Sequence, residues 1–75
     1  MERTVKINAV YRHFKGTLYR VITVARHTES DEELVVYTAS DGNGIVYARP
    51  AEMFLSEVDK EKYPEVTARY RFEEV

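Results

Sequence analysis

Apolar and polar residues alternate with a period of two along most of this chain, as they do in half-buried β-strands. The first such run covers Val10–Phe14, and Tyr19–Arg26 and Glu33–Ala39 follow it. Ile45–Arg49 forms the next run, and Val66–Phe72 is interpreted as a last strand that closes the sheet. The pattern therefore predicts an all-β protein.

Turn-forming residues separate these runs at short intervals. Gly16 follows the first run, and Ser40–Gly44 combines Asp, Asn and Gly, the residues that most readily adopt a left-handed backbone. Pro50 ends the fourth run because proline has no amide hydrogen for a β-ladder. Short strands joined by such turns indicate a meander.

One short helical turn is expected between Pro50 and Leu55, where its apolar pair, Met53 and Phe54, would plug the end of a barrel. The resulting prediction is a small, partly open SH3-like barrel of five or six strands with one short helical turn. A chain of 75 residues supports a single core, so residues 1–75 are expected to form one domain.

Composition narrows the functional classes. The chain has no cysteine, which excludes a disulfide framework and a thiolate metal site. Its longest apolar stretches, such as Leu34–Tyr37, are too short for a transmembrane helix, and Met1–Ala9 lacks the pattern of a secretory signal. We therefore expect a soluble cytoplasmic protein with no membrane association.

Charge is distributed unevenly along the chain. Residues 1–30 contain six basic and two acidic side chains, whereas residues 31–75 contain five basic and eleven acidic ones. Single-stranded nucleic-acid binding through Arg12, Lys15, Arg20 and Arg26 is one hypothesis that follows. The net charge of −2 lacks the basic excess typical of nucleic-acid-binding proteins.

Aromatic and cationic side chains interleave in the segment from Tyr11 to Lys15. Strand alternation places Tyr11, His13 and Lys15 on one face, and Tyr37 is the other tyrosine expected to line a groove. Arg49 is suited to anchor a ligand there, with Glu52 as a neighbouring carboxylate. The leading hypothesis is a module that binds a protein or peptide partner in this groove.

An enzyme is the third hypothesis. His13 and His27, with Glu29 or Glu52, have the side-chain chemistry of a metal site or a general base. No ligand spacing, Gly-x-Ser-x-Gly elbow or phosphate-binding glycine loop supports catalysis. We therefore predict a non-enzymatic protein without a metal or other cofactor.

Five blocks of the chain resemble, in order and approximate spacing, a family of short bacterial proteins named domain of unknown function 1653. The blocks are Tyr11-Arg12-His13-Phe14-Lys15-Gly16, Tyr19-Arg20-Val21, Ala25-Arg26-His27-Thr28-Glu29, Glu32-Glu33-Leu34-Val35-Val36-Tyr37, and Arg49-Pro50 with Glu52-Met53-Phe54. The resemblance covers residues 10–58. It implies a compact β fold and a bacterial, cytosolic origin, and no established activity.

The matching polar positions are more numerous than a packed core requires. The resemblance and the residue pattern together indicate a candidate ligand-binding set of eight residues. These are Tyr11, Arg12, His13, Lys15, His27, Tyr37, Arg49 and Glu52. A buried polar network that sets strand register would select the same positions. The exposed strand edges of a small open barrel also make a homodimer a reasonable expectation.

Overall fold

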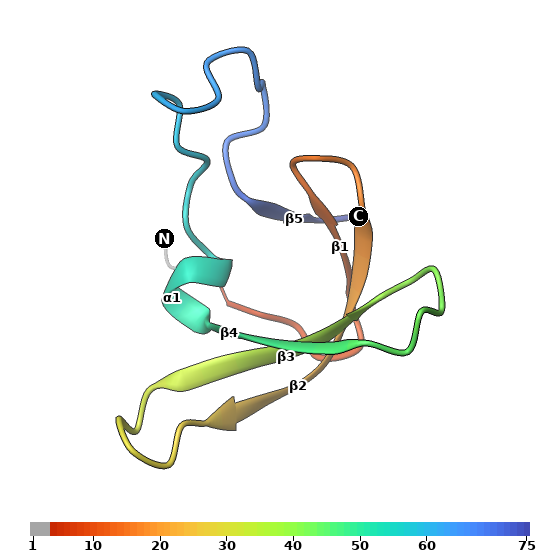
Figure 1. Ribbon diagram of the computed structural model, residues 1–75, viewed down its shortest axis with the longest axis vertical. Helices are drawn as coiled ribbons and strands as arrows, with labels where there is room; N and C mark the ends of the chain where they lie inside the picture. Colours follow the sequence, from red (N-terminus) through yellow and green to blue (C-terminus); the bar gives the residue numbers. More distant parts are fainter. Residues whose placement is uncertain (1–3) are drawn as a thin grey trace.

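The computed structural model describes residues 4–75, which fold into one antiparallel five-stranded sheet with a single helical turn (Figure 1). The elements are β1 (Val10–His13), β2 (Leu18–Arg26), β3 (Glu33–Ala39), β4 (Val46–Pro50), α1 (Ala51–Phe54) and β5 (Phe72–Glu74). This arrangement confirms the predicted all-β class, with five strands and one short helical turn. Within residues 4–75, no helix has the length and apolar character needed to cross a membrane.

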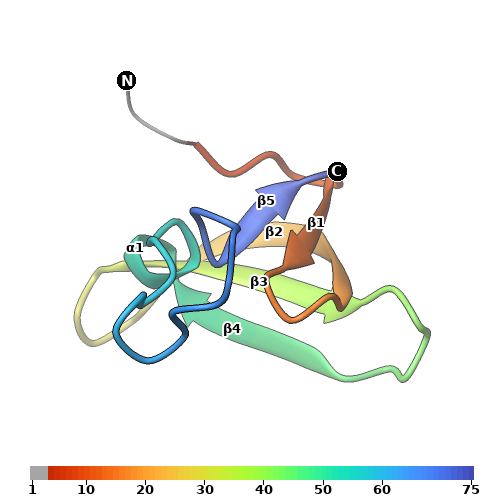
Figure 2. The ribbon, with the colours of Figure 1, turned by 90° about the horizontal axis from the view of Figure 1, so that it is seen from above.

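The strands lie in the order β4-β3-β2-β1-β5. Strands β1 to β4 therefore form a meander, and β5 adds to it beside β1. The sheet is curved and does not close, and β4 and β5 form its two edges (Figures 1 and 2). Pro50 ends β4 as its last residue, a tolerated position because β4 is an edge strand.

A β-bulge interrupts the long second strand. Val21 pairs with Tyr37, but Thr23 pairs with Val36, so Ile22 is an extra residue. The bulge shifts the alternation, because Tyr19, Val21 and then Val24 share the core-facing side. The continuous alternation expected over Tyr19–Arg26 is therefore wrong beyond Val21.

The core lies in the concave side of the sheet and is strongly aromatic. Phe54 and Phe72 are fully buried and stack with their centroids 4.1 Å apart, and Val21 and Val35 pack around them. Phe54 plugs the core as expected. Met53 does not, since it is 47% exposed on the outer side of α1.

The last strand is shorter and later than the predicted Val66–Phe72. Residues 66–71 form no strand and contact the segment after α1, through the Glu57–Tyr70 bridge and a hydrogen bond from the Val58 amide to the Arg69 carbonyl. Only Phe72–Glu74 joins the sheet, beside β1. The strand predicted over Val66–Phe72 is therefore wrong except at Phe72, because alternation does not identify a partner strand.

Candidate functional site

Four cationic side chains and a histidine gather around a pocket of about 310 Å³. We call it the basic pocket, and its lining comprises His13, Phe14, Lys15, Arg49, Asp59, Lys62, Tyr63 and Arg71. Two lysines and two arginines line it together with a single carboxylate, and two aromatic rings supply apolar wall. Such a hollow concentrates positive potential and attracts anions.

The β1–β2 turn supplies one wall of the basic pocket. Gly16 has φ of +105°, a conformation that glycine adopts at little cost, and its amide closes the turn on the His13 carbonyl. The Phe14 amide donates to the Arg71 carbonyl at 2.9 Å, which joins the turn to the segment before β5. The turn therefore holds Lys15 beside the C-terminal part of the chain.

The opposite wall comes from the segment after α1. The Tyr63 ring lies 4.9 Å from the Phe14 ring, centroid to centroid. Lys15 Nζ lies 5.4 Å from the Tyr63 centroid and 5.9 Å from that of Phe14, within the range of cation–π attraction. The exposed end of Lys15 is thus held near the pocket by rings, leaving its charge available to a ligand.

His13 connects the basic pocket to the core. Its ring packs against Phe72 at 4.9 Å, and its Nδ1 accepts a hydrogen bond from the Lys15 amide at 3.2 Å. Burial lowers the pKa of His13, and the charges of Arg49, Lys15 and Arg71 lower it further. The neutral imidazole, with its hydrogen on Nε2, is therefore the favoured form and can donate to an anion.

Arg49 reaches the same region from the far edge of the sheet. Its guanidinium carbon lies 5.5 Å from the centroid of the buried Phe72 ring. Burial raises the pKa of Tyr37, while the Arg49 guanidinium opposes that shift through its charge and a hydrogen bond. Arg49 is consequently held in place by the core while it lines the pocket.

Two of the candidate residues are core residues. Tyr11 is 2% exposed and its hydroxyl accepts a hydrogen bond from the Lys6 amide at 3.0 Å. Tyr37 is 5% exposed and packs against the rings of Phe54 and Phe72. Both were expected to line the groove, but the concave sheet turns these apolar rings inward.

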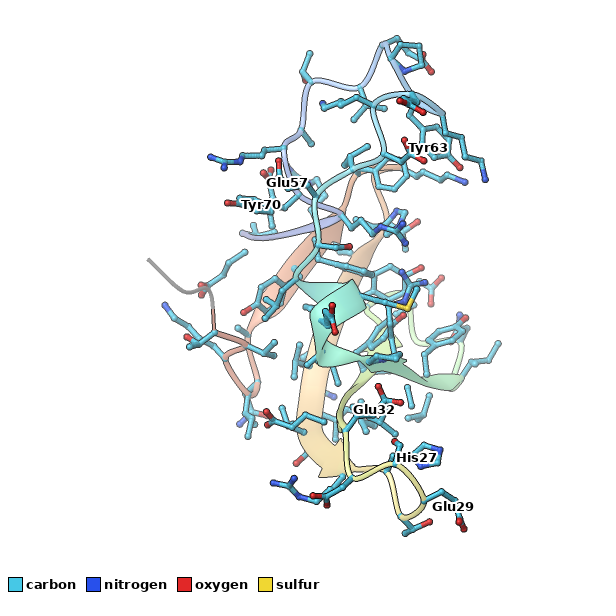
Figure 3. All side chains as sticks on the ribbon, turned by 90° about the vertical axis from the view of Figure 1, so that its left-hand side faces the viewer. His27, Glu29, Glu32, Glu57, Tyr63 and Tyr70 are labelled. Carbon is cyan, nitrogen blue, oxygen red and sulfur yellow. The ribbon has the colours of Figure 1, made fainter. Side chains whose placement is uncertain are left out.

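His27 and Glu29 lie at the other end of the sheet from the basic pocket. Figure 3 shows both in the β2–β3 turn, with Tyr63 at the opposite end of the molecule. Nine residues of β2 separate that turn from the β1–β2 turn, roughly 30 Å of extended chain. His27 Nδ1 instead accepts hydrogen bonds from the Glu29 and Ser30 amides, at 3.0 and 3.2 Å.

A two-histidine metal site is not assembled by this fold. Across residues 4–75, no three His, Asp or Glu side chains are grouped closely enough to hold a metal ion. His13 and His27 stand at opposite ends of β2, so they cannot share a ligand sphere.

The remaining candidates are dispersed. Arg12 is exposed on the outer face of β1, directly across from Glu73 on β5. Glu52 lies on α1 at a separate, larger groove whose other walls are mostly apolar and include Glu33. None of the ion pairs found within residues 4–75 joins Glu52 to Arg49. The structure therefore brings together His13, Lys15 and Arg49 from the predicted set.

The comparison with protein families places nearly the whole chain in one family. The family model described as Protein of unknown function (DUF1653) matches residues 9–74. This chain belongs to that family. Neither a curated protein nor a solved structure gives a significant match to this DUF1653 protein.

The DUF1653 match extends well beyond residues 10–58, over which the resemblance was recognised from the sequence. The additional residues include four that line the basic pocket and that sequence reasoning missed, namely Asp59, Lys62, Tyr63 and Arg71. A signal for them exists. Lys60-Glu61-Lys62-Tyr63 and Arg69-Tyr70-Arg71 interleave cations with tyrosine, as the segment from Tyr11 to Lys15 does.

Proposed function

We propose that this DUF1653 protein is a binding module that recognises an acidic segment of a protein partner through the basic pocket. One observation carries the proposal: Lys15, Arg49, Lys62 and Arg71 converge on a pocket that contains a single carboxylate. Free cations close together repel one another, so a bound anion relieves that repulsion as well as adding its own contacts.

The chemistry of the lining suits carboxylates. Two arginines present planar forks that pair with carboxylate oxygens in a bidentate fashion, and two lysines add mobile ammonium groups. Phe14 and Tyr63 offer ring surface to the apolar part of an acidic side chain and to its neighbours. A peptide carrying several Asp or Glu residues therefore fits the pocket better than a neutral peptide does.

Single-stranded nucleic acid would require a continuous cationic track along the backbone. Arg20 is on the outer face of β2, whereas Arg26 lies past the bulge, on the core-facing side, and forms an ion pair with Asp31. Arg12 is opposed by Glu73. Arg12 and Arg20 share the outer face of the sheet, whereas Arg26 lies on the core-facing side and Lys15 lines the basic pocket, so the four cations form no continuous track. An acidic peptide is therefore the better-supported ligand, and nucleic acid is an arm of the test.

The proposal assigns no catalysis, metal or cofactor to the protein. A bacterial origin and a cytoplasmic location stay predictions, because they come from the family resemblance and the composition.

The test is an NMR chemical-shift titration of isotope-labelled protein with hexaglutamate, with hexalysine and with a short single-stranded oligonucleotide, at about 50 mM and 300 mM salt. We expect hexaglutamate to shift the amide signals around Lys15, Lys62 and Arg71, less strongly at high salt. Hexalysine should leave them unchanged.

Charge-removal variants locate the binding. Lys15→Ala combined with Lys62→Ala should weaken hexaglutamate binding by about 10-fold, because two exposed charge contacts are lost. Arg12→Ala combined with Arg20→Ala is the matched control, since it also removes two exposed positive charges, from the outer face of β1 and β2. No binding of hexaglutamate, or equal losses in both variants, would refute the proposal, and tighter binding of the oligonucleotide would favour nucleic acid.

A further inference from the structure

The outer edge of β4 carries no paired strand within residues 4–75. Within residues 4–75, β4 pairs only with β3, so its other side presents backbone hydrogen-bonding groups to solvent. Ile45, Val46 and Tyr47 are 52%, 58% and 36% exposed. The other edge is β5, which is three residues long and carries Glu73 and Glu74. Charged side chains and short length discourage the addition of a further strand at β5. The β4 edge is longer, and its residues from Ile45 to Ala48 are uncharged.

The direction of each β4 backbone group follows from the sheet register. The Ser40 amide donates to the Leu18 carbonyl, so Ser40 turns its backbone groups toward β2. Thr38, two residues earlier on β3, turns its backbone groups the same way. Tyr37 must then turn its groups toward β4, where it faces Tyr47. Every second residue of β4 thus bonds to β3, and the N–H and C=O of Val46 and Ala48 point outward.

Side chains follow the same alternation. Tyr47 stacks on the core residue Tyr37 at 5.5 Å, so Tyr47 and Arg49 lie on the inner side of β4, where the basic pocket is. Val46 and Ala48 lie on the outer side. In an antiparallel strand added to this edge, residues facing Val46 and Ala48 would exchange backbone hydrogen bonds, and residues facing Tyr47 and Arg49 would project inward.

We propose that the acidic partner binds as an extended strand added antiparallel to β4, with its acidic side chains on the inner side next to Arg49 and its apolar side chains over Val46. This inference rests on the proposed function and adds the binding mode. The positive charge of Arg49 and of the basic pocket favours an added strand that carries acidic side chains. A side chain directly across from Arg49 has its Cβ about 5 Å from that of Arg49, so a carboxylate there can reach the guanidinium.

A seven-residue peptide in which glutamate and valine alternate is the probe, with affinity measured by NMR titration. In the proposed geometry its valine amides donate to β4 and its glutamate amides point away. N-methylation of the valine amides should therefore weaken binding by about 10-fold or more, because at least two hydrogen bonds are lost. N-methylation of the glutamate amides is the matched control and should change affinity less than about 2-fold.

The protein offers an independent variant. Ala48→Pro removes the outward amide hydrogen and leaves the bonds to β3 in place, an exchange that edge strands tolerate. It should reproduce the loss seen with valine methylation, and an unchanged spectrum away from β4 verifies the fold. Ala48→Val keeps the amide and should bind as the wild type does.

The outcomes separate this inference from the proposed function. Equal affinity of the two methylated peptides overturns the strand addition, and shifts that persist around Lys15 would then leave acidic-peptide binding intact. Absence of binding by the unmodified peptide overturns the strand addition, and it overturns the proposed function as well only where hexaglutamate also fails to bind. Light scattering that shows a dimer with slowly exchanging Val46 and Ala48 amides also overturns the inference, because a second copy would then occupy the edge.

Discussion

Replacement of Phe54 by alanine tests how the core supports the candidate site. Phe54 is the buried residue of the four-residue helix α1 and has no exposed surface. Its ring stacks on Phe72 at 4.1 Å and makes edge contacts with Tyr11 at 5.3 Å and Tyr37 at 5.4 Å. Removing the ring would leave a cavity bounded by three other aromatic side chains.

The magnitude follows from known costs of such cavities. Phe→Ala changes in protein cores lower the free energy of unfolding by about 3–5 kcal/mol. A chain of 75 residues has a total stability of roughly 4–11 kcal/mol. We therefore expect Phe54→Ala to lose about 3–5 kcal/mol, enough to unfold it partly at 25 °C if the total stability lies at the low end of that range. Phe54→Leu, which keeps most of the apolar volume, should lose about 1–2 kcal/mol.

Urea unfolding followed by circular dichroism measures both losses. Met53→Ala is the matched control, because Met53 is the neighbouring residue and is 47% exposed, and it should change the stability by less than about 0.5 kcal/mol. A loss below about 1.5 kcal/mol for Phe54→Ala would refute the described packing of α1 against the aromatic core. Since α1 leads into the segment that carries Lys62 and Tyr63, Phe54→Leu should also weaken hexaglutamate binding at the basic pocket.

Two histidine predictions follow from the hydrogen bonds and charges. The folded state lowers the pKa of His13 below 6.5, so it binds fewer protons than the unfolded chain. The free energy of unfolding should therefore hold steady above about pH 6.5 and fall as the pH drops through the lower folded pKa. Urea melts at about pH 7.5 and 5.5 should show this fall in the wild type and a smaller one in His13→Gln, and equal falls would contradict it. At the other end of the sheet, His27→Ala removes the acceptor of two backbone amides and should cost about 1 kcal/mol. Hydrogen exchange of the Glu29 and Ser30 amides should accelerate in that variant and not in Thr28→Ala; unchanged rates would show that the ring does not order the turn.

Local patterns predicted the first four strands closely. Glu33–Ala39 was predicted with the bounds it has, and Val10–Phe14 and Tyr19–Arg26 were each correct to within one residue at either end. The turns were predictable because Gly16 and Gly42 adopt positive φ where glycine costs least. The extra residue in β2 was not predictable, since a bulge depends on the pairing with β3 and leaves no mark in a run of β-branched residues.

The site was predicted only in part, for a similar reason. His13, Lys15 and Arg49 were recognised by their chemistry, and the structure brings them together. Tyr11 and Tyr37 have the same chemistry as groove-lining tyrosines, but burial depends on which way the sheet curves. The other two cations, Lys62 and Arg71, lie in the irregular segment between α1 and β5, and no local sequence pattern predicts the path of that segment.

The amino-acid sequence by itself determined the strand-forming segments, the turns and the abundance of cations next to aromatic rings, because backbone preference and side-chain period act over a few residues. Tertiary structure alone decided that Phe72–Glu74 pairs with β1, that Arg49 and Lys15 line one pocket, and that within residues 4–75 only β3 pairs with β4. Those outcomes depend on contacts between residues far apart in the chain, whose energies arise only when the aromatic core assembles and excludes water.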